Sequence, residues 1–573
     1  MLHLRQGYDF DVAIVGGGPA GSTCATLLKK WSPSLRVTVL ERESFPRDHV
    51  GESLLPPTSQ ILEEMGCWDL IEAANFPIKI GATYRWGKSP ERWDFEFIQG
   101  EKFVDEPRPA NFRGQRRQTA FQVDRSIYDK ILLDHAGSIG VEVREKTKVV
   151  KVNREGDALT GLETESGEVV RAAHYVDASG NSGIIRRALD IECRYPSTLR
   201  NIAIYDYWQN AQWAVRIGVG GTRIQVLSLG YGWIWFIPIG PTRTSIGLVV
   251  PVEYFKQAGL DRKEMYERAI TEEPMVAALL QGATSEGRLQ ATRDWSFLAD
   301  RHAGENWFLI GECSGFADPI LSAGVTMAHI GGRQAAYTIL EILRGEPEPQ
   351  WLKSQFESRQ KQRIETHIRF ADYWYTANEQ FKDLKSFTSQ LAKDIGLEME
   401  PDKAWRWIAT GGFINEDLNI GIGGYSLDAI RDSAEFLTEL ASKSPLEKNN
   451  RFKLDIEGSS MREFGVYVNG RVQRARCFFR GDRVLPITGE IDLLLRILQK
   501  ESKLASIMAA LTSIAQNNAA NPALVNIVWS APPALEAMIY DGWVKASYDP
   551  KLPLGKIARH GTGFRWNRDR RTK

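Results

Sequence analysis

The sequence predicts an α/β fold that continues into a β-sheet region and ends in a mainly helical C-terminal region. Residues 8–41 read as strand, turn, helix and strand: YDFDVAIV is apolar, STCATLLKKW has apolar residues at helical spacing, and RVTVLER is a second apolar run. Two later segments, HYVDASG at 174–180 and NWFLIGECSG at 306–315, each read as a strand that ends in a glycine-containing turn. Strands that alternate with helices in this way predict a parallel sheet.

The turn after the first strand carries Gly-x-Gly-x-x-Gly, formed by Gly16, Gly18 and Gly21. This spacing predicts a Rossmann-like dinucleotide site, because glycines permit a tight turn, close approach of the backbone to a pyrophosphate and close packing of helix on strand. Ala20 lies in the first turn of the predicted helix, whose N-terminus would face the phosphates. Glu41 ends the second strand about 20 residues further on, where an acidic residue accepts a ribose hydroxyl.

The composition excludes several classes of function. Lys plus Arg and Asp plus Glu each number 72, so no global field favours nucleic acid or an anionic membrane. The five cysteines are never spaced Cys-x-x-Cys, which predicts neither a disulfide framework nor a metal site. The N-terminus has no signal-peptide pattern, and no apolar run approaches the roughly 18 residues of a membrane span. We therefore expect a cytoplasmic protein with neither nucleic acid nor membrane as partner.

The length of 573 residues predicts more than one domain, because single cores stop growing at about 250–300 residues. We expect a core over residues 1–343, a helical region over 344–442 and a small module over 443–573. The first boundary rests on the charged, proline-bearing stretch RGEPEPQWLK, which begins at residue 344. The helical region has aromatic residues near one face, which indicates ordinary core packing; the family resemblance given below implies instead that this region covers the substrate cleft. These residues are Phe370, Tyr373, Trp374 and Phe381.

The C-terminal module reads as a hairpin, GVYVNGRVQRARCFF, then the helices GEIDLLLRILQKE and LASIMAALTSIA, then PPALEAMIYDGWVKAS ending in a strand. This order predicts a winged-helix-like unit. Its association with DNA is disfavoured by the neutral charge of the chain. The last 23 residues carry eight Lys or Arg and one acidic residue, which predicts a solvated tail or a surface for an acidic carrier protein.

Three segments in a fixed order indicate which dinucleotide is bound. Arg125 precedes a helix in TAFQVDRSIYDKILLDHA, Asp177 and Gly180 end one strand, and Gly311 ends another. This order resembles the flavin monooxygenases of the para-hydroxybenzoate hydroxylase fold, and the resemblance implies FAD. The family usually has Gly-Asp where this chain has Gly311-Glu312. No second glycine triplet precedes a helix, so no NAD(P)H site is evident and we expect a separate flavin reductase.

Within this fold, roughly residues 8–415 resemble the flavin-dependent halogenases. The first reason is FPRDHVGESLLPP at 45–57, which resembles the irregular segment that these enzymes place beside the flavin. The second is Lys79 in NFPIKIGATYRWG, which matches the catalytic lysine of the family. The resemblance implies that reduced FAD and O2 form a C4a-hydroperoxide, halide attacks it, and Lys79 holds the resulting hypohalous acid. A buried ammonium donates hydrogen bonds to such an oxidant, or forms a haloamine if its pKa is lowered.

Two further motifs complete the resemblance. WIWFIP at 233–238 matches the signature Trp-x-Trp-x-Ile-Pro, in which Trp233 and Trp235 would separate the substrate from the flavin. DPILSAGV at 318–325 precedes a helix, and its amides form an anion nest. By resemblance, Ala323 and Gly324 would hold chloride or bromide, with Ser322 in a catalytic role.

The resemblance also implies the remaining cofactor residues and the branch of the family. Tryptophan halogenases carry a catalytic Glu where this chain has Leu321, which favours the branch that acts on phenols or pyrroles. The residues expected to hold FAD are Gly16, Gly18, Ala20, Gly21, Glu41, Arg42, Arg47, Gly51, Glu52, Ser53, Arg125, Asp177, Gly180, Gly311, Glu312, Asp318, Gly324 and Val325.

We therefore expect an FADH2- and O2-dependent halogenase of secondary metabolism, acting on an electron-rich phenol or pyrrole that is free or tethered to an acyl or peptidyl carrier protein. The alternative is a flavin monooxygenase that hydroxylates an aromatic side chain of a small molecule or peptide. A third reading is a flavoprotein without catalytic activity, in which the C-terminal module is the functional part.

Overall fold

The computed structural model describes residues 7–98, 100–218, 220–394, 444–481, 483–554 and the backbone of 564–566. The chain forms two units, of which the first comprises residues 1–397, 469–472 and 565–573 and the second comprises 398–468 and 473–564. The helical region expected from residue 344 therefore begins within the first unit. The expected boundary at 442–443 and the end of the halogenase-like region, from residue 395 to about 415, lie outside the described residues.

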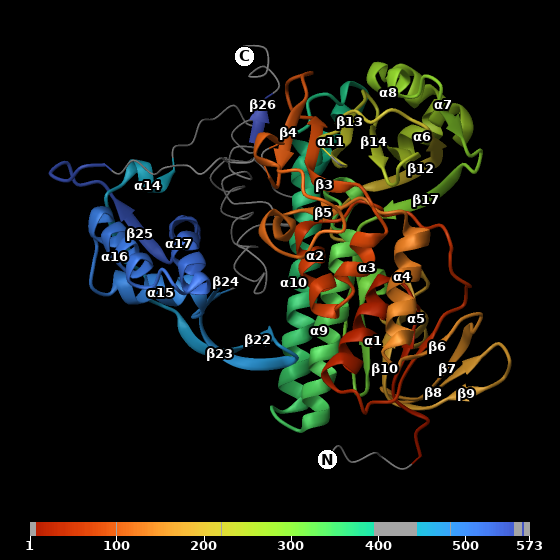
Figure 1. Ribbon diagram of the computed structural model, residues 1–573, viewed down its shortest axis with the longest axis horizontal. Coiled ribbons are helices and arrows are strands. Elements are labelled where there is room, and N and C mark those ends of the chain that lie inside the picture. The colour runs from red at the N-terminus through yellow and green to blue at the C-terminus, as the bar shows by residue number, and fades with distance from the viewer. Residues whose placement is uncertain are drawn as a thin grey trace. The chain divides into compact units, whose positions relative to one another are not determined.

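The glycine-rich turn belongs to a five-stranded parallel sheet with the order β19-β10-β1-β2-β6. Its strands are β1 (Phe10–Val15), β2 (Val37–Leu40), β6 (Glu142–Arg144), β10 (Ala172–Asp177) and β19 (Trp307–Leu309). β1 and β2 are buried throughout, as their apolar runs predict. The helices α1 (Pro19–Trp31), α4 (Arg125–Ser138) and α9 (Gly324–Arg344) pack together, and α10 (Pro349–Thr376) lies along α9 (Figure 1). The predicted Rossmann-like core is confirmed.

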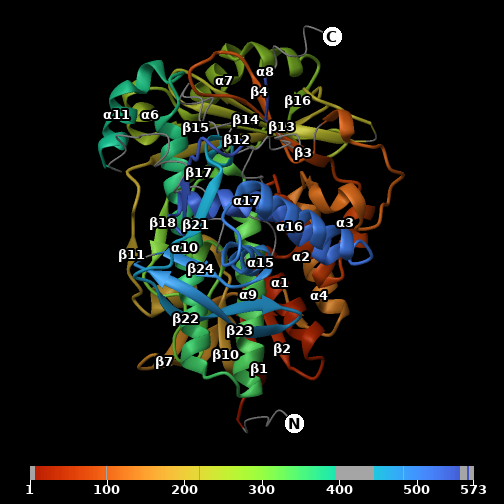
Figure 2. The same ribbon diagram turned by 90° about the vertical axis from the view of Figure 1, so that its left-hand side faces the viewer.

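A larger mixed sheet forms the second layer, with the order β16-β12-β15-β14-β13-β3-β4. Its strands are β3 (Ile78–Arg85), β4 (Trp93–Glu96), β12 (Arg200–Gln209), β13 (Gly221–Ser228), β14 (Trp233–Pro238), β15 (Arg243–Pro251) and β16 (Thr284–Ser285), with β17 (Gln290–Trp295) beside β12 and β5 (Ala120–Phe121) beside β3. One face packs against α6 (Val252–Ala258), α7 (Arg262–Glu272) and α8 (Pro274–Leu279), which gather over β12 and β15 (Figures 1 and 2). On the opposite face, Val226 and Trp235 line a cavity.

Shorter elements complete the first unit. They are α2 (Pro56–Met65), α3 (Trp68–Ala73), α5 (Ile184–Ala188), α11 (Lys385–Asp394), the sheet of β7 (Val149–Glu155), β8 (Ala158–Thr164) and β9 (Val169–Val170), and the sheet of β11 (Cys193–Arg194), β18 (Phe297–Ala299) and β20 (Gly315–Phe316). Within the described residues, every helix is too short or too polar to span a bilayer.

The second unit is built from the predicted hairpin, helices and final strand and from additional short elements. They are α14 (Pro445–Lys448), β21 (Arg451–Leu454), β22 (Ser460–Val468), β23 (Arg471–Arg480), β24 (Arg483–Pro486), α15 (Gly489–Leu498), α16 (Leu504–Asn517), α17 (Pro522–Tyr540) and β25 (Val544–Ser547). The segment PPALEAMIYDGWVKAS lies largely within a longer helix, α17, which begins at Pro522, where the side chain of Asn521 accepts a hydrogen bond from the amide of Leu524. It continues through Pro532 and Pro533, so these prolines do not mark its start.

Candidate functional site

A cavity of about 1140 Å³ begins at the carboxyl ends of the parallel strands. Val15, Leu40 and Gly311, which end or follow β1, β2 and β19, line one end of it, and the other end reaches the large mixed sheet. Carboxyl ends of parallel strands are where open α/β sheets bind ligands. The volume exceeds that of pockets for drug-sized ligands, which are about 300–1,000 Å³, so the cavity has room for a dinucleotide.

The glycine-rich turn is shaped as a close-contact cradle. Gly16 has a φ of +104°, and a Cβ there would lie 2.4 Å from the carbonyl oxygen of Ala178. A Cβ on Gly21 would lie 2.0 Å from the carbonyl oxygen of Gly16. Oε2 of Glu41 accepts the amide of Gly17 at 2.7 Å, so this carboxylate holds the turn while it also lines the cavity. The N-terminus of α1 opens into the same space, as a pyrophosphate site requires.

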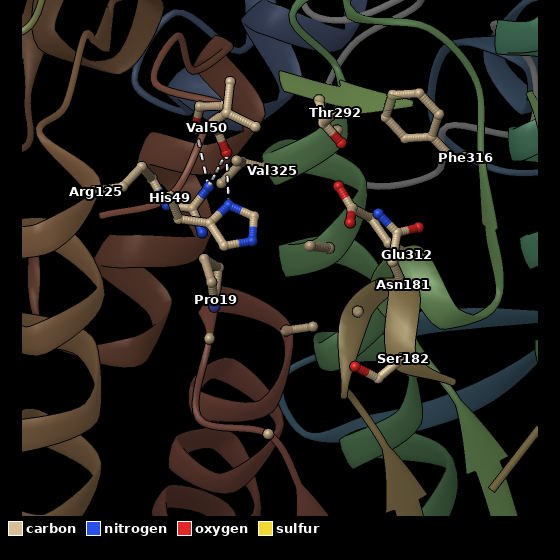
Figure 3. Close-up of a pocket in the computed structure, with 18 of the residues that line it drawn as sticks. Pro19, His49, Val50, Arg125, Asn181, Ser182, Thr292, Glu312, Phe316 and Val325 are labelled. Atoms are coloured by element: carbon tan, nitrogen blue, oxygen red, sulfur yellow. Dashed lines mark hydrogen bonds between the residues drawn. The ribbon is translucent and has the colours of Figure 1, made fainter. Parts of the chain in front are cut away.

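The segment at 45–57 passes beside the cavity without regular structure until α2 begins. The guanidinium of Arg125 donates to the carbonyls of Val50 at 3.0 Å and Gly51 at 3.2 Å, and pairs with both oxygens of buried Asp129. Nδ1 of His49 lies 2.7 Å from the carbonyl of Val50 (Figure 3). Because a carbonyl only accepts, this nitrogen carries the proton, and Nε2 is left as an acceptor. His49 lines the cavity and is a candidate that the sequence did not single out.

Glu52 is a buried carboxyl in the same segment. It accepts the hydroxyl of Tyr207 at 3.0 Å and the amide of Gly51 at 3.0 Å, and burial raises its pKa. Tyr207 comes from β12, more than 150 residues away, so no local sequence pattern indicates this pair.

The turns after β10 and β19 both reach the cavity, but the carboxylates of these two turns, Asp177 and Glu312, are placed differently. Glu312 and Gly180 line it, and Figure 3 shows Glu312 beside Asn181 at its edge. Asp177 does not line the cavity, although the sequence placed it among the FAD residues. Its carboxylate accepts four hydrogen bonds from Ser179, Ile185 and Arg186, so it shapes the turn after β10.

The tryptophan wall, which we define as Trp233 and Trp235, lines the far end of the cavity from β14. Val226 of β13 registers with Trp235 and lines the cavity with it. The absence of a side chain at Gly247 leaves room for the indole of Trp235, since a Cβ there would lie 2.1 Å from the ring. Alternate residues of a strand share a face, so both tryptophans project from the face that bounds the cavity.

Lys79 projects from this same face but does not line the cavity. It registers with Thr222 on β13, and Thr222 shares a face with Ile224 and Val226, which both line the cavity. The lysine is fully buried, and among the described residues its Nζ has no hydrogen-bond partner. Nζ lies 5.5 Å from the ring centre of Phe97, and burial lowers its pKa to about 7.

A Lys79→Met variant is therefore expected to be more stable than the wild type at pH 7.5, with a smaller advantage at pH 9.5. The pKa of Lys79 is about 7 in the folded chain, against the ordinary value of 10.5 for lysine, so at a pH between these two values the unfolded chain binds a proton that the folded chain largely lacks. Unfolding free energy then rises with pH in the wild type by up to about 1.4 kcal/mol per unit. Urea unfolding at both pH values should show that the stability advantage of Lys79→Met over the wild type is smaller at pH 9.5 than at pH 7.5 by about 2 kcal/mol. An unchanged difference would mean that the amine is solvated.

The turn before α9 matches an anion nest in its geometry. Oδ1 of Asp318 accepts the amide of Ile320 at 2.8 Å, and Ser322 has a φ of +56°, which turns the chain sharply into α9. Ser322, Gly324 and Val325 line the cavity, and a Cβ on Gly324 would meet open space. Ala323 and Asp318 are buried outside the lining.

Most of the expected site residues meet at this one cavity. Those that line it are Gly16, Gly18, Ala20, Glu41, Arg42, Arg47, Gly51, Glu52, Ser53, Arg125, Gly180, Trp233, Trp235, Gly311, Glu312, Ser322, Gly324 and Val325. Those that do not are Gly21, Lys79, Asp177, Asp318 and Ala323. The four aromatic residues expected on one face of the helical region are buried and also lie outside the lining. Among the residues with described positions, no three His, Cys, Asp or Glu side chains gather as metal ligands.

Comparison with known proteins agrees with this geometry. Residues 11–106 and 98–390 match the family described as tryptophan halogenase. The tryptophan 2-halogenase of Chondromyces crocatus is 33% identical over 343 residues, which cover 58% of this chain and 62% of that protein, less than two thirds of its length. The 1H-pyrrole-2-carbonyl-(peptidyl-carrier protein) chlorinase of Pseudomonas fluorescens is 31% identical over 385 residues, which cover 65% and 84%.

Two solved structures are similar in fold. The myxobacterial chondrochloren halogenase has 29% identity and a TM-score of 0.58, covering 75% of this chain and 97% of that one. The flavin-dependent halogenase CmlS has 24% identity and a TM-score of 0.70, covering 97% and 99%. The second likeness concerns the fold alone, and it extends over both units of the chain.

Proposed function

This chain belongs to the tryptophan halogenase family, and from that premise we propose that it is an FAD-dependent halogenase of an electron-rich aromatic ring. The observation that carries the proposal is the buried amine of Lys79, which has no hydrogen-bond partner among the described residues and shares a sheet face with the tryptophan wall. A fully buried ammonium without a partner is costly to maintain, so its presence needs a chemical reason.

The residues around the cavity suit FAD. The glycine turn and the N-terminus of α1 would hold the pyrophosphate, Glu41 the ribose, and Arg125 with the segment at 45–57 the flavin. Reduced FAD, when bound, would supply the two electrons that bring O2 to the peroxide level, and that oxidant would in turn oxidise the halide to hypohalous acid. The turn from Ser322 to Gly324 would bind the halide at the start of α9.

The chain's own residues divide the reaction into two compartments. The tryptophan wall keeps the aromatic substrate away from the flavin, so that the small halide reaches the oxidant first. Lys79 then receives hypohalous acid on the other side. With a pKa near neutrality, its amine exists in both protonation states, and the charged state donates hydrogen bonds that hold the acid toward the ring.

The substrate is proposed to be a phenol or pyrrole, carried as a thioester on an acyl or peptidyl carrier protein. Leu321 stands where tryptophan halogenases have a catalytic Glu, so the chain lacks a carboxylate for a less activated ring. Identity of 31% to a chlorinase that acts on a carrier-bound pyrrole supports the tether. Reduced FAD is proposed to come from a separate flavin reductase.

The experiment is mass spectrometry of the product formed with bromide. The protein is incubated with FAD, a flavin reductase, NADH and a panel of phenols and pyrroles, each offered free and carrier-bound. We expect a bromine isotope doublet on a carrier-bound ring. A product heavier by one oxygen and free of halogen would replace the proposal with aromatic hydroxylation.

A further inference from the structure

Tyr375 lies in the last turn of α10, outside the cavity, yet it contacts the cavity-lining residue Trp233 and two residues outside the lining, Asn201 and Asp318. It is 2% exposed. Its hydroxyl oxygen accepts Nε1–H of Trp233 at 2.8 Å and Nδ2–H of Asn201 at 3.4 Å. Its own proton is donated to Oδ1 of Asp318 at 3.5 Å. Three distant segments, β14, β12 and the turn before α9, therefore meet at one oxygen atom.

The direction of these bonds is fixed by chemistry. An indole N–H and an amide NH₂ only donate, so the oxygen of Tyr375 must accept from both of them with its lone pairs. The single hydroxyl hydrogen is then left for the carboxylate of Asp318. When Asp318 is ionised, the hydroxyl can accept from Trp233 and donate toward Asp318 at the same time, so the orientation of the indole is coupled to the position of the carboxylate.

Both partners belong to the proposed reaction path. Trp233 is one half of the tryptophan wall, and Asp318 starts the turn that leads to Ser322 and Gly324. Burial raises the pKa of Asp318 to about 7, while the hydrogen bonds from Ile320 and Tyr375 favour its ionised form and the nearby Asp372 opposes it. The hydroxyl of Tyr375 thus also stabilises the carboxylate that caps the turn.

The ring of Tyr375 is held independently of its hydroxyl. It lies 5.8 Å from the ring of Trp86 at an interplanar angle of 90°, and 6.1 Å from the ring of Phe381. The indole of Trp86 in turn donates to the carbonyl of Trp374 at 2.7 Å. Removal of the hydroxyl alone therefore leaves these ring contacts in place, which makes the role of the hydroxyl testable.

We propose that Tyr375 is a positioning residue that locks Trp233 against the turn from Asp318 to Gly324 and so keeps the aromatic substrate apart from the flavin. The inference rests on the proposed function, because the separation matters only if halide and ring must reach different compartments. Tyr375 does not line the cavity, so it would act through the orientation of Trp233.

The test compares Tyr375→Phe with Tyr373→Phe, a matched control two residues earlier on the same helix. Tyr373 is equally buried, and among the described residues its hydroxyl has no hydrogen-bond partner. For each protein, the measurement gives the share of the consumed reduced FAD that yields halogenated product, hydroxylated product or peroxide. In Tyr375→Phe we expect the halogenated share to fall by about fivefold or more, in line with the loss of a buried hydrogen bond, with FAD affinity unchanged. Tyr373→Phe should match the wild type.

A double-mutant comparison separates positioning from a general structural effect. If Tyr375 acts through Trp233, then Tyr375→Phe changes the product shares of a Trp233→Phe protein by less than about twofold, because the two changes are coupled. An additive effect, or an unchanged share in Tyr375→Phe alone, would overturn the inference.

A second readout does not require halogenation. In protein labelled with ¹⁵N-tryptophan, the indole N–H that disappears in Trp233→Phe should exchange slowly in the wild type and in Tyr373→Phe, and rapidly in Tyr375→Phe. Equal exchange in all three would contradict the locking of Trp233. A wild type that yields no halogenated ring, but retains this exchange pattern, would remove the proposed function and leave the positioning of Trp233 in place.

Discussion

Replacement of Lys79 by alanine is expected to lower halogenation by about 10³-fold while reduced FAD and O2 are still consumed. A loss of this size is typical when an essential proton-donating group is removed from a site where charge develops during the reaction. Cofactor binding should not change, because Lys79 does not line the cavity. The oxidising equivalents that no longer reach the ring should appear as peroxide or hypohalous acid in solution, measured against flavin consumed.

Two further variants of the same residue serve as controls. Lys79→Met preserves length without the amine and should be as inactive as Lys79→Ala, which excludes a cavity effect. Lys79→Arg keeps a cation but is bulkier in a fully buried place, so its loss of activity should be accompanied by a loss of stability. A Lys79→Met protein that brominates at the wild-type rate would remove the amine from the reaction.

Substitution of Gly21 by alanine is expected to weaken FAD binding by about 100-fold or more, equal to about 2.7 kcal/mol. The added Cβ would lie 2.0 Å from the carbonyl oxygen of Gly16, a backbone atom that cannot move without opening the turn. Titration of the apoprotein with FAD, followed by quenching of flavin fluorescence, measures the change.

Gly137→Ala is the matched control for this substitution. Gly137 lies within α4, and a Cβ there would meet Cγ2 of Val143 at 3.7 Å, an ordinary contact. The variant should bind FAD normally and gain about 0.5–1 kcal/mol of stability from helix propensity. If Gly21→Ala bound FAD as tightly as Gly137→Ala, the glycine turn would not be the pyrophosphate site.

The sequence predicts the parallel core well because its signals are local. Apolar runs end at Val15 and Leu40, the glycine turn follows at fixed spacing, and each strand appears where its pattern indicates. The turns also bring Glu41, Gly180 and Gly311 to one cavity, since carboxyl ends of parallel strands meet at one edge.

Features that depend on contacts between distant segments could not be predicted from such local patterns. A lone lysine on a strand carries no signal of its own, and Lys79 was identified only through its matched segment. Its burial on the face of the tryptophan wall depends on the pairing of β3 with β13, where the register shifts between Thr222 and Arg223. The carboxylates of Asp177 and Asp318 follow predicted strands or turns, but local amides engage both of them.

A crystal structure of the protein with FAD and a bound aromatic substrate tests the central claim most directly. The account predicts the ring beside Nζ of Lys79, with Trp233 and Trp235 standing between it and the flavin. A ring stacked directly against the flavin, or a Lys79 amine surrounded by bulk water, would contradict it.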